Sequence, residues 1–264
     1  MLEERGLAPQ HRFGQNFLID HNQLKRLVDA SGIGAGATVL EIGPGTGTLT
    51  EELLARGARV VAAEIDRGMA ALLRERLGTN PDFTLVEGDC LESKRALAPA
   101  LLDAVGGGEF SLVANLPYAA ATPVMMILLA DHPRCRGQYV TVQYEVAQRV
   151  LAGPGSKDYG PLSVLAQATA QPGLIARLPP SCFWPQPDVQ SAMIALPRRT
   201  SPLCDDPRGL VDFCQRVFEQ RRKQLGSILG RTGEWPEGVA PDQRAEALSV
   251  ERLISLWRTR GRAR

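Results

Sequence analysis

Three glycines at alternate positions, Gly43, Gly45 and Gly47, separate a short apolar run from an amphipathic one. The apolar run at residues 37–42 is typical of a buried strand, and residues 49–56 have the spacing of a helix. Glycine permits backbone angles that other residues avoid, and it lets a ligand approach the main chain closely. A strand, a glycine turn and a helix in this order favour an open α/β sheet, which binds ligands at the carboxyl ends of its strands.

The alternation of strand-like and helix-like runs continues along most of the chain. Further strands are predicted at residues 58–65, 83–89, 110–116 and 137–144, and further helices at 69–77 and 123–130. Strands that alternate with helices imply a parallel sheet with helices on both faces. The predicted fold class is therefore α/β, with a Rossmann-like sheet.

The pattern changes after residue 197, where strand-like runs give way to helix-like ones. Helices are predicted at residues 210–229, 242–249 and 251–257. Prolines, serine and threonine near Arg199–Pro207 suggest a connector. We therefore predict a first, α/β domain at residues 1–200 and a small helical domain at residues 201–264. A domain of this size is marginally stable alone, so we expect it to pack on the first.

Several functional classes have no support in the sequence. The first twenty residues contain no apolar core of a signal peptide, and no run approaches the length of a membrane span. The five cysteines form no CxxC pair, and the three histidines do not cluster with them, so no metal site is predicted. We expect a cytoplasmic monomer that binds no membrane and no metal. The net charge of +1 does not by itself indicate nucleic-acid binding.

The spacing around the glycine turn narrows the choice of cofactor. Glu64 lies 21 residues after Gly43, at the end of the next predicted strand, where an acid can bind the hydroxyls of a ribose. NAD would also suit these features, but its GxGxxG fingerprint would need glycine in place of Thr48. Glu41, just before the turn, would repel a pyrophosphate but suits a cofactor with an ammonium and a sulfonium group. The pattern ExGxGxG resembles motif I of class I methyltransferases, which use S-adenosyl-L-methionine. Another nucleotide or a structural turn remains the alternative.

Asp89 ends the third predicted strand, within the segment EGDC. One interpretation is that it caps the next helix. The other is that it binds the adenine amino group of the cofactor. Because Glu64 ends a neighbouring strand, the second interpretation is favoured.

The fourth predicted strand ends with the tetrapeptide NLPY, from Asn115 to Tyr118. An amino nitrogen on an aromatic ring is a poor nucleophile, since its lone pair is delocalised into the ring. Hydrogen-bond acceptors localise that lone pair, and the Asn115 side-chain oxygen and the Leu116 carbonyl are suitable acceptors. Tyr118 offers a flat face on which a flipped base can stack. Similar motifs occur in DNA, RNA and protein-glutamine methyltransferases, so NLPY predicts the chemistry better than the polymer. A structural turn with a core tyrosine is the alternative.

Taken together, several blocks resemble the KsgA family, the dimethyladenosine transferases of small-subunit ribosomal RNA. In order, they are HRFGQNFLID (11–20), LEIGPGTGTLTEEL (40–53), AEIDR (63–67), EGDC (87–90), ANLPY (114–118), EVAQRVLAGPGSKDYGPLSVLAQ (145–167), LPPSCFWPQPDVQSAMIAL (178–196) and FEQRRKQL (218–225). The resemblance spans residues 11–230 and implies a class I methyltransferase domain followed by the small helical domain.

The resemblance also implies roles for individual residues. It implies cofactor contacts from Asn16, Leu18, Gly43, Glu64, Asp89 and Asn115. Asn115 would also touch the target amine, and Phe183 would sandwich the target base opposite Tyr118. A core position is the alternative for Phe183.

The implied activity is transfer of methyl groups from S-adenosyl-L-methionine to N6 of two adjacent adenosines in small-subunit (16S) ribosomal RNA, two per base. The implied partner is the immature small ribosomal subunit. Two alternatives remain: an Erm-like large-subunit RNA methyltransferase, and an assembly factor with weak catalysis. The second rests on Ala119 and Ala120, where the family usually has polar residues after NLPY. Tyr144 likewise replaces a lysine that is common in the family.

Arg221, Arg222 and Lys223 are adjacent and lie within the helix predicted at residues 210–229. They suggest a phosphate clamp for a folded RNA. Successive residues of a helix turn by about 100°, so the three cannot share one face. A solvated helix surface is the alternative.

Overall fold

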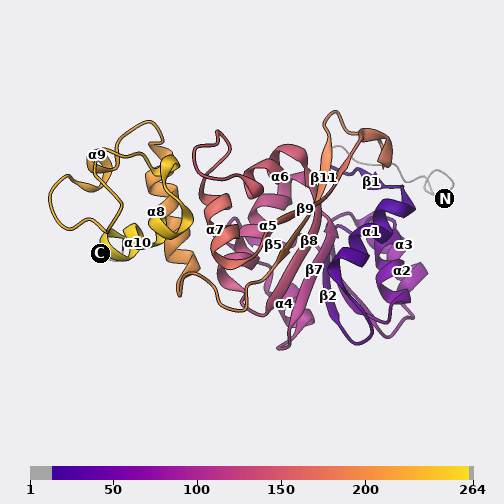
Figure 1. The fold of residues 1–264 in the computed structure, drawn as a ribbon. Coiled ribbons are helices and arrows are strands. Elements are labelled where there is room, and N and C mark those ends of the chain that lie inside the picture. Colours follow the sequence, from indigo (N-terminus) through magenta and orange to yellow (C-terminus); the bar gives the residue numbers. More distant parts are fainter. Residues whose placement is uncertain (1–13, 262–264) are drawn as a thin grey trace.

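A central sheet of seven strands organises the computed structural model, which describes residues 14–261 (Figure 1). The strands in spatial order are β4 (Phe83–Glu87), β3 (Arg59–Glu64), β2 (Thr38–Ile42), β7 (Phe110–Asn115), β8 (Cys135–Gln143), β11 (Ser191–Pro197) and β9 (Gly173–Leu178). Neighbouring strands from β4 to β8 are parallel, whereas β11 is antiparallel to both β8 and β9. The α/β class is confirmed, and the five strands that the sequence predicts are parallel as expected; β9 and β11 were not predicted, and β11 makes the sheet mixed.

Strand β11 is antiparallel because the chain turns back after the edge strand β9 and pairs with it, between β9 and β8. Its sequence is apolar at most positions, and its first four residues are buried. The edge strand β9 alternates between exposed and buried positions over only part of its length. Both runs are short and follow or precede prolines, so periodicity did not single them out as strands.

Helices cover both faces of the sheet, as predicted. One face carries α1 (His21–Ser31), α2 (Thr48–Ala55) and α3 (Arg67–Leu77), and the other carries α4 (Pro99–Val105), α5 (Tyr118–Asp131), α6 (Tyr144–Leu151) and α7 (Pro161–Thr169). Successive side chains of a strand point to opposite faces. Accordingly, Val39 joins the core under α1 and α2, whereas Leu40 and Ile42 join the core under α5.

The helical part contains α8 (Pro207–Glu219), α9 (Leu225–Leu229) and α10 (Val250–Arg260), and it lies at one end of the molecule (Figure 1). Its apolar core includes Trp257 and continues into Tyr159 and Val164 of the α/β part. It therefore packs on the first part, as expected for so small a unit. The division at residue 200 stays a prediction.

The predicted helix at 210–229 is wrong, because the chain leaves the helix after Glu219 and re-enters one at Leu225. The Leu225 amide donates a hydrogen bond to the Gln243 carbonyl at 2.7 Å, and the Gly226 amide donates to the Pro241 carbonyl at 2.7 Å. These contacts fix the turn between the two helices. The helix predicted at 242–249 is also wrong, since only a 3-10 turn forms, at Ala245–Ala247.

Within the described range, no helix has the length and apolar character needed to cross a lipid bilayer. The first three residues of the HRFGQNFLID block, 11–13, lie outside the described residues.

Candidate active site

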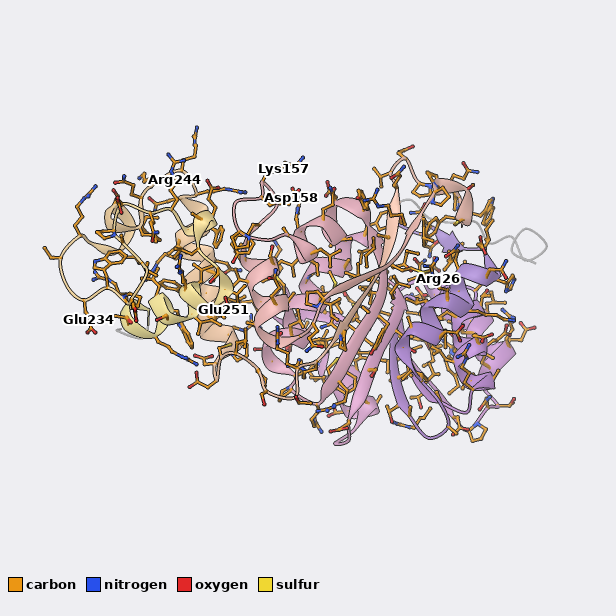
Figure 2. All side chains as sticks on the ribbon, viewed as in Figure 1. Arg26, Lys157, Asp158, Glu234, Arg244 and Glu251 are labelled. Atoms are coloured by element: carbon orange, nitrogen blue, oxygen red, sulfur yellow. The ribbon has the colours of Figure 1, made fainter. Side chains whose placement is uncertain are left out.

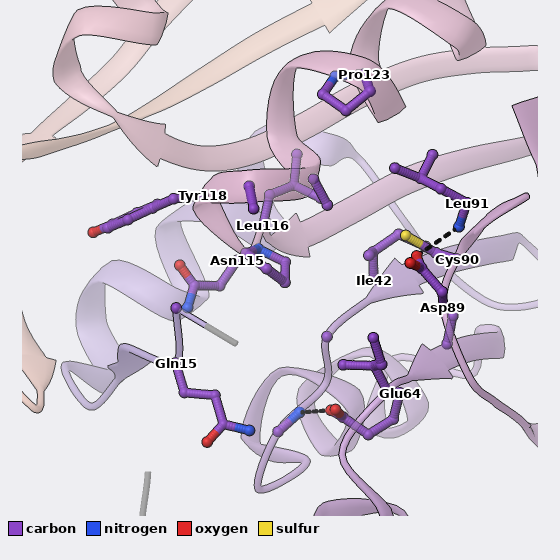
Figure 3. Close-up of a pocket in the computed structure, with 18 of the residues that line it drawn as sticks. Gln15, Ile42, Glu64, Asp89, Cys90, Leu91, Asn115, Leu116, Tyr118 and Pro123 are labelled. Atoms are coloured by element: carbon purple, nitrogen blue, oxygen red, sulfur yellow. Dashed lines mark hydrogen bonds between the residues drawn. The ribbon is translucent and has the colours of Figure 1, made fainter. Parts of the chain in front are cut away.

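A cavity of about 620 Å³ opens at the carboxyl ends of β2, β3, β4 and β7 (Figure 3). Each of these strands contributes residues at or just after its end, and residues 14–17 and the start of α5 complete the walls. The predicted site residues that line it are Asn16, Gly43, Glu64, Asp89, Asn115, Leu116 and Tyr118. The structure thus brings together residues that are up to 102 positions apart in the sequence (16 to 118).

The glycine turn can adopt its conformation only because it lacks side chains. Gly43 and Gly45 have φ angles of 69° and 57°, in the left-handed region that favours glycine. A Cβ atom on Gly43 would lie 2.8 Å from Pro117 Cγ, and one on Gly45 would lie 2.6 Å from the Phe17 ring. Pro117 and Phe17 therefore pack directly against the main chain of the turn, in the space that any other residue would need for its side chain.

Glu64 connects the turn to the next strand. It is only 4% exposed, and its two carboxylate oxygens accept hydrogen bonds from the Gly45 amide at 3.1 Å and the Asp66 amide at 2.8 Å. Burial raises the pKa of Glu64, while these amide donors act in the opposite direction. The carboxylate is thus held at the cavity wall by the main chain (Figure 3).

Glu41 does not line the cavity, contrary to the interpretation that it faces the charged end of a cofactor. It is 1% exposed, and its Oε2 accepts a hydrogen bond from the Thr50 hydroxyl at 2.7 Å. Burial raises its pKa to about 8, and the nearby Glu64 adds to this effect. Its contact is with α2, behind the turn.

Asp89 lies on the cavity wall at the end of β4. Its Oδ1 accepts a hydrogen bond from the Leu91 amide at 2.9 Å, as the dashed line in Figure 3 shows. The chain continues into a hairpin of β5 (Leu91–Ser93) and β6 (Ala96–Leu97), so the interpretation of Asp89 as a helix cap is wrong.

The NLPY segment ends β7 and begins α5. The Asn115 side-chain amide donates a hydrogen bond to the Asn16 carbonyl at 2.8 Å, which leaves its Oδ1 as an acceptor at the cavity. The Leu116 amide donates to the Thr141 carbonyl at 3.1 Å, which ties the segment to β8. The Tyr118 hydroxyl lies 3.1 Å from the Ser191 hydroxyl, and burial raises the pKa of Tyr118.

Leu18 and Phe183 are not part of the cavity wall. Leu18 in β1 (Phe17–Leu18) pairs with Phe183 in β10 (Phe183–Trp184), and the two are 8% and 1% exposed. Both belong to the core beneath α1. For Phe183 this placement matches the core alternative rather than the sandwich opposite Tyr118.

Other lining residues were missed by the sequence analysis. They are Gln15, Ile65, Cys90, Leu91, Lys94 and Met126, among others. Ile65 and Cys90 directly follow Glu64 and Asp89, so their positions after strand ends could have indicated them. Lys94 comes from the turn of the β5–β6 hairpin, for which the sequence offered no signal.

The basic cluster, Arg221, Arg222 and Lys223, lies in the turn between α8 and α9, not in a helix. Arg221 is occupied within the protein: it pairs with Glu246 and donates to the carbonyls of Ser156, at 2.6 Å, and Lys157. Arg222 and Lys223 are exposed. A second cavity of about 360 Å³ lies beside Arg221, and Arg149 and Lys157 also line it. Figure 2 shows Lys157 at the tip of the loop between α6 and α7, next to the helical part.

The chain is similar to known proteins over nearly its whole length. A family model described as "Ribosomal RNA adenine dimethylase" matches residues 7–259. A protein of Moorella thermoacetica named Ribosomal RNA small subunit methyltransferase A is 38% identical, over 98% of this chain and 95% of its own. A protein of the same name from Acidobacterium capsulatum is 40% identical, over 97% of this chain and 94% of its own.

Solved structures share the architecture. A dimethyladenosine transferase from Plasmodium falciparum has a TM-score of 0.76 at 22% identity and covers 92% of this chain and 96% of its own. The 23S rRNA methyltransferase ErmE has a TM-score of 0.69 at 25% identity and covers 93% of this chain and 99% of its own. These likenesses confirm the predicted fold, a Rossmann-like class I methyltransferase domain.

Proposed function

Because the chain belongs to the ribosomal RNA adenine dimethylase family, we propose that it transfers methyl groups from S-adenosyl-L-methionine to N6 of two adjacent adenosines in small-subunit (16S) ribosomal RNA. The product is N6,N6-dimethyladenosine. The observation that carries the proposal is the Asn115 side chain, whose amide group is engaged by Asn16 so that its oxygen remains an acceptor on the cavity wall.

The cavity suits S-adenosyl-L-methionine. Gly43 and Gly45 line the cavity and have no side chains, so a ligand can reach the main chain there. Glu64 offers carboxylate oxygens for ribose hydroxyls, and Asp89 offers an acceptor for an adenine amino group. Asn16, from the N-terminal segment, borders the same space. When bound, this cofactor supplies a methyl group on a positively charged sulfur.

The protein's contribution to the chemistry is to prepare the amino nitrogen of the target base. The Asn115 oxygen and the Leu116 carbonyl accept hydrogen bonds from that amino group and localise its lone pair. The Tyr118 ring supports the flipped base by stacking, and the Tyr118–Ser191 contact holds the ring in place. No strong general base is required, since the nitrogen becomes acidic once it is alkylated.

The substrate is the RNA of an immature small ribosomal subunit, bound by a monomer of the protein in the cytoplasm. Arg222 and Lys223 are exposed and suited to phosphate contacts, whereas Arg221 holds the turn that presents them. Arg149 and Lys157 border the neighbouring hollow and extend this basic surface toward the catalytic part.

The proposal is tested by incubating the protein and cofactor with small subunits that lack the modification and mapping the RNA products by mass spectrometry. We expect two adjacent N6,N6-dimethyladenosines in 16S RNA. Methylation of large-subunit RNA alone would instead indicate an Erm-like enzyme. Cofactor binding without methyl transfer to either RNA would indicate an assembly factor.

A further inference from the structure

Most of the large apolar side chains that are exposed within residues 14–261 lie in the cavity or on and near the β1–β10 ribbon, whose Phe17 lines the cavity. Among residues 14–261 the exposed ones are Ile19, Ile65, Leu174, Trp184 and Val189. Ile65 lines the cavity itself, and Ile19, Trp184 and Val189 belong to the β1–β10 ribbon and the loop that follows it. Single exposed apolar residues are ordinary on protein surfaces, whereas several grouped beside a cavity are typical of an interaction site.

Trp184 is connected to the cavity through one other ring. Phe17 lines the cavity, and its ring centroid lies 6.4 Å from that of Trp184, with an angle of 24° between the planes. Trp184 is 40% exposed, whereas its neighbour Phe183 is 1% exposed, because successive strand residues point to opposite sides. The indole ring thus forms the outer layer of a stack that begins at the cavity wall.

The loop that follows Trp184 is anchored at the same rim. At its far end, the Tyr144 amide donates a hydrogen bond to the Gln190 carbonyl at 2.9 Å. The next residue, Ser191, meets the hydroxyl of Tyr118. Both ends of the loop therefore contact residues at the cavity, and the Trp184 ring is held beside the site rather than on a free segment.

We propose that the exposed face of Trp184 is a stacking site for the nucleobase next to the target adenosine. This inference rests on the proposed function. A base that enters the cavity must leave the stack of its neighbours, which exposes a face of the adjacent base. Aromatic side chains replace such lost stacking in single-stranded RNA, and they do so with little dependence on base identity. Trp184 provides such a face one ring outside the cavity.

The first test is the kinetics of methylation of unmodified small subunits. We expect Trp184→Leu, which keeps an apolar side chain but removes the ring, to raise KM for the subunits about tenfold, because stacking contributes on this scale. Its Kd for S-adenosyl-L-methionine should stay at the wild-type value. Trp184→Phe, which keeps a ring, should have a KM for the subunits close to the wild-type value. Leu174→Ala is the matched control, because Leu174 is also apolar and 47% exposed but lies on the edge strand β9.

The second test detects stacking directly through tryptophan fluorescence. The chain has three tryptophans, at positions 184, 235 and 257. Trp257 is buried and Trp235 lies under the Arg260 guanidinium, so the signal lost in Trp184→Phe isolates Trp184. We expect a short single-stranded oligoadenylate to quench this signal, and the same RNA backbone without bases to leave it unchanged.

The outcomes separate this inference from the function on which it rests. A wild-type protein that methylates small subunits, with Trp184→Leu at the wild-type KM and no quenching by oligoadenylate, would overturn the stacking site and leave the function intact. Equal quenching by the baseless backbone would also overturn it, since the ring would then contact the backbone. A wild-type protein that methylates no ribosomal RNA would contradict the function itself.

Discussion

Replacing Glu64 with alanine removes the acceptors of the Gly45 and Asp66 amides, and we expect it to weaken both the fold and cofactor binding. The Gly45 and Asp66 amides that donate to Glu64 are buried, so each would lose its partner. A buried donor without an acceptor costs about 1–3 kcal/mol, which gives a loss of roughly 2–6 kcal/mol in the free energy of unfolding. A hydrogen bond from a ribose hydroxyl to a carboxylate contributes about 1.5–3 kcal/mol, so Kd for S-adenosyl-L-methionine should rise by about tenfold to 150-fold.

Two measurements on three proteins check this expectation. Denaturant unfolding gives the free energy of unfolding, and isothermal titration calorimetry gives the cofactor Kd under conditions in which each variant is folded. Glu64→Gln is the matched control: it keeps one carbonyl oxygen, so it can satisfy one of the two amides and should lose about half as much stability. If Glu64→Ala unfolds at the same denaturant concentration as the wild type and has the same cofactor Kd, then Glu64 has neither the structural nor the ligand-binding role.

Three further predictions concern the rest of the site and the RNA surface. Asn115→Ala should lower methyl-transfer turnover by roughly 100-fold while the protein stays folded, as judged by circular dichroism, because the target amine loses its side-chain acceptor; turnover near the wild-type rate would contradict the mechanism. Glu41 has a pKa raised from 4.5 to about 8, so the wild type should lose stability as pH rises between these values, by roughly 4–5 kcal/mol in total. Glu41→Gln keeps an acceptor for Thr50 and should not show this loss; parallel stability curves for the two proteins from pH 5 to 8.5 would disprove it. The double variant Arg222→Ala/Lys223→Ala should weaken binding to immature small subunits, lower the salt slope of log affinity by about two and leave cofactor Kd unchanged, whereas identical slopes would mean that these residues form a solvated surface.

The cavity residues that the sequence predicts are those whose position follows from the end of a single predicted strand. Gly43 follows a predicted strand, Glu64, Asp89 and Asn115 lie at or near the ends of three others, and parallel strands bring their carboxyl ends to one edge. Their meeting could therefore be inferred without knowing any tertiary contact. Lys94 could not be found in this way, because a two-residue turn of a short hairpin carries it to the cavity. The reversal of β11 was missed for a similar reason, since direction in a sheet edge depends on pairing rather than on local periodicity.

The basic cluster shows how tertiary contacts change the meaning of a charged run. Three adjacent cations looked equivalent in the sequence, but the chain turns at Gln220 and separates their surroundings. Arg221 is drawn into the junction by Glu246 and by the carbonyls of Ser156 and Lys157. Arg221 therefore connects the two parts of the chain, and of the three cations only Arg222 and Lys223 are exposed.

The same dependence on pairing explains the roles assigned to Phe183 and Trp184. Two adjacent aromatic residues in a strand must face opposite sides, but the sequence does not say which one faces the core. The pairing of Phe183 with Leu18 decides that Phe183 is the one that faces the core, because Leu18 belongs to the core beneath α1. Phe183 is thereby buried, and Trp184 is turned outward against Phe17 at the cavity. An exposed aromatic ring therefore persists in this segment, displaced by one residue, and it is the ring that we propose as a stacking site for the base next to the target.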